Sequence, residues 1–142
     1  MSIPSRALAV LLLSALGACQ PPPPRQLLDR EGLQLQLRSL ASAAAEAGLM
    51  TQQLADRRLS GGFAWVEQQG LGEDAARAAA ELARPAGVEL RPAQREAMQL
   101  AASLQLELNQ VAAARHDGSA LGALEARFGA LRTQAQRLER AL

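Results

Sequence analysis

The C-terminal stretch SALGALEARFGALRTQAQRLERAL, residues 119–142, carries the most regular hydrophobic pattern of the chain. Its apolar side chains recur at alternating steps of three and four residues, at Leu121, Leu124, Phe128, Leu131, Ala135, Leu138 and Leu142. In an α-helix this spacing places all of them on one face. A stripe of this kind packs along a neighbouring helix at a shallow angle. The stretch therefore predicts a bundle of helices.

A second helix is predicted directly before this stretch. It starts at Pro92, a residue favoured in the first helical turn, and stops at Gly118. Its apolar line consists of Ala97, Leu100, Leu104, Leu108 and Val111. Asp117 and Ser119 are candidate N-caps of the last helix. The short turn from His116 to Ser119 forces the two helices into an antiparallel αα-hairpin.

The rest of the chain from Arg25 onward is also rich in Ala and Leu and poor in β-branched residues, which favours helix. One helix is predicted over roughly residues 26–58, with Gly48 as a candidate break or kink. Its apolar line consists of Leu33, Leu37, Leu40, Ala44, Ala47 and Leu54. Another helix is expected to start at Glu73 and Asp74 and to end at Pro85 and Gly87. The expected fold is all-α, a small antiparallel helical bundle of four to five helices over residues 26–142.

The segment Phe63-Ala64-Trp65-Val66 contains the only tryptophan of the chain and one of its two phenylalanines. It follows Ser60-Gly61-Gly62, which offers a hinge or a helix N-cap. One interpretation is a short helix over residues 62–69 that plugs the end of the bundle. The other is a partly exposed patch of Phe63, Trp65 and Val66 that binds a partner, because tryptophan is enriched among binding hot spots. Since a tryptophan is hard to fit into a core built on Ala, we expect Trp65 at the rim of a cleft between the first helix and the C-terminal hairpin.

The sequence offers little catalytic chemistry. His116 is the only histidine and Cys19 the only cysteine, so a zinc site made of protein ligands alone is not expected. Glycine-rich phosphate loops and nucleophile elbows are absent. Removing residues 1–18, which include Arg6, lowers the formal net charge from +1 to zero and argues against nucleic acid as a partner. We therefore expect no catalytic residues, no enzyme activity and no metal.

The N-terminal segment has the layout of a secretory signal peptide, with Arg6 before an apolar run that is too short to span a bilayer. At its end, Leu16-Gly17-Ala18-Cys19 resembles the lipobox of bacterial lipoproteins. The resemblance implies cleavage before Cys19, so that residues 1–18 are the signal peptide, and a covalent lipid on the Cys19 thiol as the only attached group. Gln20 stands where an Asp commonly retains such proteins in the inner membrane, which implies an anchor in the outer membrane, facing the periplasm.

Four prolines, Pro21 to Pro24, follow the cysteine. Such a run cannot form a helix or pair in a sheet, and it favours the extended polyproline II conformation. Residues 19–25 are therefore predicted to be a lipidated cysteine with a stiff spacer, which holds the helical domain of residues 26–142 away from the membrane.

Two classes of function follow from these predictions. The first is a non-enzymatic protein that docks or escorts another envelope protein, in the manner of secretion-system pilotins. The second starts from Leu90-Arg91-Pro92-Ala93-Gln94, which is similar to part of the periplasmic helical chaperones and metal or stress sensors that carry an LTxxQ motif, with Arg91 in place of the Thr. The sequence leaves the partner and the oligomeric state open.

Overall fold

The computed structural model describes residues 27–142, which form four α-helices. They are α2 (Arg30–Ala55), α3 (Gly61–Leu82), α4 (Arg91–Ala114) and α5 (Gly118–Ala141). The expected all-α bundle is confirmed, and the described residues form four helices rather than five. The expected signal peptide, the cleavage site with Cys19 and the proline spacer lie outside the described residues.

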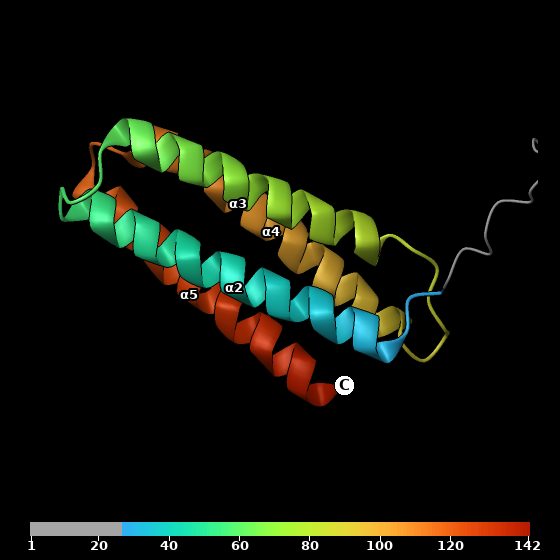
Figure 1. The fold of residues 1–142 in the computed structure, drawn as a ribbon. Helices are drawn as coiled ribbons and strands as arrows, with labels where there is room; N and C mark the ends of the chain where they lie inside the picture. The colour runs from blue at the N-terminus through green and yellow to red at the C-terminus, as the bar shows by residue number, and fades with distance from the viewer. Residues whose placement is uncertain (1–26) are drawn as a thin grey trace, which may run out of the picture.

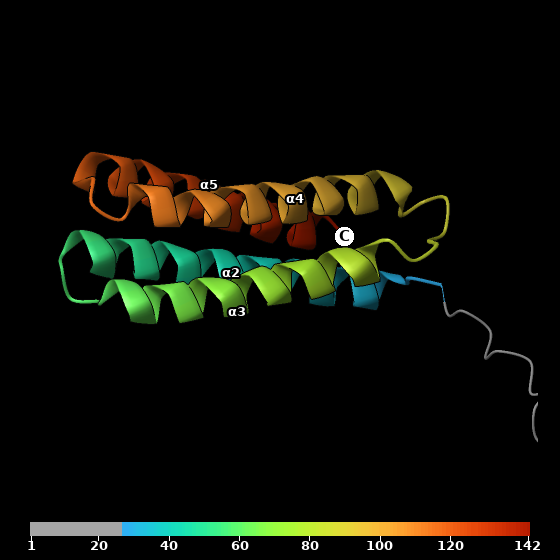
Figure 2. The same ribbon diagram turned by 90° about the horizontal axis from the view of Figure 1, so that it is seen from above.

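The four helices run alternately up and down, so that each packs against the next one in the chain and α5 returns to pack against α2 (Figure 1). Seen from above, α2 and α3 form one layer and α4 and α5 the other (Figure 2). We call the end that carries residues 56–60 and the turn between α4 and α5 the tip of the bundle. The opposite end, with residues 83–90, is the base. The predicted αα-hairpin is therefore present as α4 and α5.

The core follows the apolar lines seen in the sequence. All predicted positions on α2 and α4 are buried, and on α5 the first half of the stripe is buried while Leu131, Leu138 and Leu142 are half-buried. Phe128 is the largest fully buried side chain. Asp117 caps α5, since its Oδ1 atom accepts hydrogen bonds from the backbone N–H groups of Ser119 and Ala120. The apolar positions and the N-cap that the sequence predicts for the C-terminal hairpin are therefore present in the structure.

The most extensive helix pairing joins α2 to α5. Gly48 does not break α2, which continues to Ala55, so the expected break at this residue is wrong. A Cβ atom at Gly48 would lie 3.8 Å from the Cβ atom of Phe128, which is an ordinary van der Waals contact, so an alanine would also fit at this position. At the edge of the same interface Arg38 Nε donates to Glu139 Oε1 over 2.6 Å.

The segment from Gly61 to Leu82 is one continuous helix, so two sequence-based expectations are wrong. No separate helix covers residues 62–69, and Glu73 and Asp74 lie in the middle of α3 rather than at a helix start. Ser60 is the N-cap, and its Oγ atom accepts a hydrogen bond from Phe63 N–H. Helix formation continues through Gly70 and Gly72 because Leu71, between them, and Ala75 are buried against the other helices. Packing has overridden the local cost of the glycines.

The base of the bundle is held by hydrogen bonds to backbone carbonyl groups. Leu28 N–H donates to Pro85 O over 2.8 Å, and Leu28 itself is buried. Gln94 Nε2 donates to the carbonyl groups of Leu82 and Arg84 at the end of α3, at 2.6 and 2.7 Å. The chain therefore enters the bundle at the base, at the far end of α2 from the tip. Within residues 27–142, none of the helices has the length and apolar character that crossing a bilayer requires.

Candidate partner-binding site at the tip

The aromatic patch, which we define as Phe63, Trp65 and Val66, lies in the first two turns of α3 at the tip. All three side chains are about 60% exposed, at 61%, 60% and 61%. Only Ala64 from this segment is buried in the core. The interpretation of these residues as a plug of the bundle is therefore wrong, and the expected rim position of Trp65 is confirmed. Partner binding by the patch stays a prediction.

Trp65 borders a small cavity that lies mainly between α3 and α4. Its lining consists of Ala64, Trp65 and Gln68 of α3, Val111 of α4, the C-cap residue Arg115 and Leu54 of α2. The expected location of the cleft, between the first helix and the C-terminal hairpin, is therefore wrong, because the cavity beside Trp65 lies mainly between α3 and α4. The exposed indole ring of Trp65, with Arg115 beside it, offers both apolar and cationic contacts to a protein surface.

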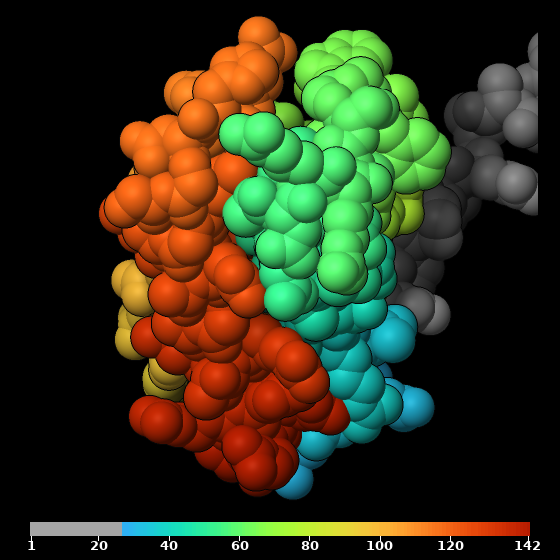
Figure 3. Space-filling view, turned by 90° about the vertical axis from the view of Figure 1, so that its left-hand side faces the viewer, coloured from blue at the N-terminus to red at the C-terminus, as the bar shows by residue number. Residues whose placement is uncertain are grey.

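A larger cavity of about 400 Å³ opens at the tip itself, and we call it the tip cavity. In the space-filling view of this end, the residues around the α2–α3 connection and those around the α4–α5 turn flank a hollow (Figure 3). Its apolar wall comes from Leu54 and Leu121, which are buried, and from Leu59. Its charged and polar rim comes from Arg57, Arg115 and His116.

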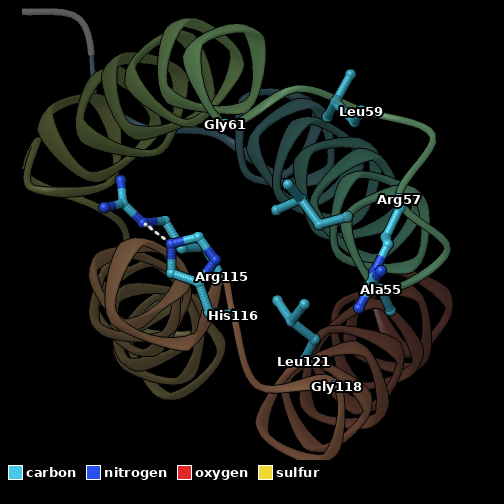
Figure 4. Close-up of a pocket in the computed structure, with 9 residues that line it drawn as sticks. Ala55, Arg57, Leu59, Gly61, Arg115, His116, Gly118 and Leu121 are labelled. Atoms are coloured by element: carbon cyan, nitrogen blue, oxygen red, sulfur yellow. Dashed lines mark hydrogen bonds between the residues drawn. The ribbon is translucent and has the colours of Figure 1, made fainter.

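The close-up shows how these rim residues are distributed. Arg57 lies on one side of the tip cavity, and Arg115 and His116 lie on the other, with Leu121 between the two sides (Figure 4). Arg115 Nε donates to His116 Nε2 over 3.0 Å. Arg115 also lines the cavity beside Trp65, so it connects the tip cavity to the aromatic patch.

Arg57 has a backbone conformation that is unusual for its residue type. Its φ angle is 56°, and among residues 27–142 no other non-glycine residue has a positive φ. It follows the C-cap Asp56, and two hydrogen bonds close the end of α2: Arg57 N–H donates to Leu54 O, and Arg58 N–H donates to Gln53 O. This is a Schellman motif, in which the residue after the C-cap is usually glycine. An arginine in this left-handed conformation costs about 1–2 kcal/mol relative to glycine.

The charged residues that line the tip cavity have one sign, although Asp56 and Asp117 stand next to Arg57 and His116 in the chain. Among its lining residues are two arginines and no carboxylate. The neighbouring Asp117 is used as the cap of α5, and no ion pair between residues 27 and 142 involves Arg57 or Arg115. By contrast, a cavity on the α4–α5 side is lined by both Asp117 and Arg127, and another by Arg95, Glu96 and Arg137. The tip cavity thus combines an apolar floor with cationic groups at its rim.

No catalytic arrangement is evident in the part of the chain that the structure describes. Across residues 27–142 no three His, Cys, Asp or Glu side chains come close enough to hold a metal ion. His116 lies in the predicted turn, exposed, with Arg115 as its hydrogen-bond partner. The expectations that the protein is not an enzyme and holds no metal or cofactor stay predictions.

Sequence reasoning found the aromatic patch but missed the tip cavity. Arg57 and Arg115 are 58 positions apart, and each follows a helix by one or two residues. An up-and-down bundle of four helices of similar length would have been enough to predict that the α2–α3 and α4–α5 connections lie at the same end. The sequence gives no sign, however, that Arg57 would take the left-handed conformation. Gln94 was likewise not recognised as the residue that caps the end of α3.

Comparison with known proteins gives no relative from which a site could be transferred. No protein-family model matches the chain, and neither the curated sequences nor the solved structures contain a significant match. We therefore infer the function from the residues of this chain alone.

Proposed function

We propose that this protein is a non-enzymatic docking or escort module, anchored in the outer membrane through a lipid on Cys19, which binds another envelope protein through its aromatic patch. The observation that carries the proposal is the exposure of Phe63, Trp65 and Val66 together at the tip. Exposed groups of this kind, next to a cavity, are typical of binding hot spots.

The position of the patch within the bundle supports the same function. The chain enters the bundle at the base, where Leu28 is buried against the α3–α4 connection. The 26 residues of α2 then lead to the tip, over about 39 Å at the helical rise of 1.5 Å per residue. A lipid on Cys19 would hold the base near the membrane, so the patch is presented at the end that reaches furthest into the periplasm.

The composition of α3 adds a second supporting feature. Gly61, Gly62, Gly70 and Gly72 all have open space where a Cβ atom would lie, so the packing of the bundle does not require them. Gly70 and Gly72, in the interior of the helix, each cost roughly 1 kcal/mol of helix stability relative to alanine. Residues without side chains next to exposed aromatic rings let a partner approach the helix closely.

The alternative function, a periplasmic chaperone or metal sensor of the LTxxQ type, has no comparable support. Gln94, which together with Leu90 matches the motif, donates two hydrogen bonds to the end of α3. This gives the residue a structural role in the bundle. Metal titration followed by thermal unfolding would distinguish the two functions, since only the sensor is expected to be stabilised by the ion.

The membrane anchor is tested by Cys19→Ser. The variant should accumulate as an uncleaved precursor that does not incorporate radiolabelled palmitate, because the lipid is attached to the thiol. The matched control is Ser14→Ala in the apolar run, which should be processed and labelled as in the wild type. Normal processing and labelling of Cys19→Ser would rule out the lipoprotein anchor.

The partner surface is tested by crosslinking in intact cells. A photo-crosslinker in place of Val66 should give a discrete crosslinked product, and Trp65→Ala should reduce affinity for the captured protein by 2 kcal/mol or more, as at hot spots. A crosslinker at Thr133, an exposed position in the second half of α5, is the control and should give no such product. If Trp65→Ala binds the captured protein as tightly as the wild type, the patch is not the docking surface.

A further inference from the structure

The charged side chains are distributed unevenly over the four helices. In α2 and α4 the arginines and carboxylates are equal in number, whereas α3 has four carboxylates against one arginine and α5 has four arginines against two carboxylates. Gly61 at the start of α3 and Gly118 at the start of α5 lie across the bundle from each other, and these two helices make no contact (Figure 4). The bundle therefore has an acidic side and a basic side that cannot neutralise each other within one molecule.

Internal ion pairs neutralise only part of this charge. On these two helices they are Arg77 with Asp74, Arg84 with Glu81, Arg127 with Glu107, and Arg38 with Glu139. Among residues 27–142, the charged side chains of α3 and α5 that take part in no ion pair are two carboxylates on α3, Glu67 and Glu73, and one carboxylate with three arginines on α5, Glu125, Arg132, Arg137 and Arg140. The opposite charge of the two sides thus remains after the internal pairing.

The same two sides allow another helix to approach closely. A Cβ atom at Gly70 of α3 or at Gly129 of α5 would meet nothing within 4 Å, so the packing of the bundle leaves both positions open. Glu73 follows Gly70 by three residues and Arg132 follows Gly129 by three, so each glycine shares a side of its helix with a charged residue. Thr133 Oγ1 donates to Gly129 O over 2.9 Å, which satisfies this hydroxyl group within the helix.

The charged residues and the glycines also lie at matching heights. Both helices start at the tip and run toward the base, so α3 and α5 are parallel (Figure 1). Glu73 lies 12 residues after the start of α3 and Arg132 lies 14 residues after the start of α5, which corresponds to about 18 and 21 Å along the two helices. Gly70 and Gly129 are offset by the same two residues. Two copies side by side in one orientation would therefore bring Glu73 of the first to Arg132 of the second.

We propose that the protein binds a second copy of itself, with α3 of one molecule against α5 of the next. The occupant is a second copy because both complementary surfaces belong to the same chain. The contact is heterologous, since each molecule uses different surfaces toward its two neighbours, and it forms a row unless the rotation between copies closes a ring. A single pair of helices with exposed ion pairs gives a weak contact. The proposal depends neither on the aromatic patch nor on a lipid at Cys19.

Disulfide crosslinking between two differently tagged full-length copies tests the contact. Gly70→Cys in one copy and Gly129→Cys in the other should form a linked heterodimer when intact cells are treated with the thiol oxidant diamide, and the open space at both positions accommodates the new side chains. Gly70→Cys in both copies, or Gly129→Cys in both, should give at most about a fifth of this product, because like helices do not meet in a heterologous contact. The wild type, with Cys19 as its only cysteine, is the blank.

Charge exchange tests whether the opposite charges hold the two copies together. In the mixed cysteine pair, Glu73→Arg in the first copy or Arg132→Glu in the second should each lower the yield about fivefold, because an attraction becomes a repulsion. Both reversals together should restore the original yield, which also shows that neither variant is misfolded. Glu46→Arg in the first copy, at an exposed position of α2, is the matched control and should leave the yield unchanged.

Three results would overturn the proposal. Equal yields from the mixed and the same-site cysteine pairs would show random collision or a symmetric contact. No heterodimer from the mixed pair would show that α3 and α5 of different copies do not meet. A loss of yield that the double exchange does not restore would show that opposite charge does not hold the contact.

A photo-crosslinker at Thr133 separates this contact from partner binding by the aromatic patch. Because Thr133 lies next to Gly129 on the basic side, its product should have the mass of two copies of this chain. The product expected through Val66 contains a different protein, so either result can fail without the other. A Thr133 product that contains another protein in place of a second copy would contradict the self-association.

Discussion

The two phenylalanines of the chain occupy opposite environments. Phe128 on α5 is fully buried between α5 and α2, whereas Phe63 on α3 is 61% exposed. A Cβ atom at Gly48 of α2 would lie 3.8 Å from the Cβ atom of Phe128, whereas a Cβ atom at any of the glycines of α3 would meet nothing within 4 Å. The hydrophobicity of the side chain is the same in both cases. Burial is therefore decided by whether a neighbouring helix packs over the ring.

The strongest test of this comparison is the pair Phe128→Ala and Phe63→Ala. Phe128→Ala should lower the free energy of unfolding by about 3–5 kcal/mol, because it removes a large buried side chain and leaves a cavity next to Gly48. Phe63→Ala should change it by no more than about 0.5 kcal/mol, as for other exposed positions. Urea denaturation followed by circular dichroism at 222 nm measures both. Similar losses for the two variants would mean that Phe63 is buried in solution.

A second, smaller effect concerns how α3 is fastened at its two ends. Its C-terminal end at the base receives two hydrogen bonds from Gln94, whereas its N-terminal end at the tip has the exposed aromatic patch. Gln94→Ala should lower the free energy of unfolding by about 1–2 kcal/mol, since two carbonyl groups lose their partner. Hydrogen exchange should become faster at the end of α3 and remain unchanged in α5. The half-exposed Gln136→Ala on α5 is the control and should have little effect on stability.

The smallest expected changes in stability come from replacing a glycine of α3 and a glycine of α2. Gly70→Ala on the outer face of α3 should raise the free energy of unfolding by about 0.5–1 kcal/mol, because alanine favours the helix and its Cβ atom meets nothing. Gly48→Ala should gain as much or slightly more, since its Cβ atom would make an ordinary contact with Phe128 at 3.8 Å. Thermal unfolding of both variants gives the comparison. A loss of stability in Gly48→Ala would show that Phe128 needs all the space beside this glycine.

The fold could be predicted largely from local patterns. The stripes on α4 and α5, Pro92 in the first turn of α4 and Asp117 as the cap of α5 all lie where the sequence indicated. The prediction failed on α3, which was divided at Gly70 and Gly72. A glycine-rich segment has a weak local preference for helix, so its continuity depends on the burial of Leu71 and Ala75 against other helices.

The candidate site, like the fold, could be predicted from the sequence only in part. The sequence alone determined that aromatic residues are scarce, that Phe63, Trp65 and Val66 stand together, and that a tryptophan would not fit easily among alanines. Only the tertiary structure decided that the two connections meet at one end of the bundle and bring Arg57 to the same cavity as Arg115 and His116. The physical reason is that hydrophobic periodicity fixes which face of each helix is buried. The meeting of two distant turns depends on the lengths of all four helices and on how they pack.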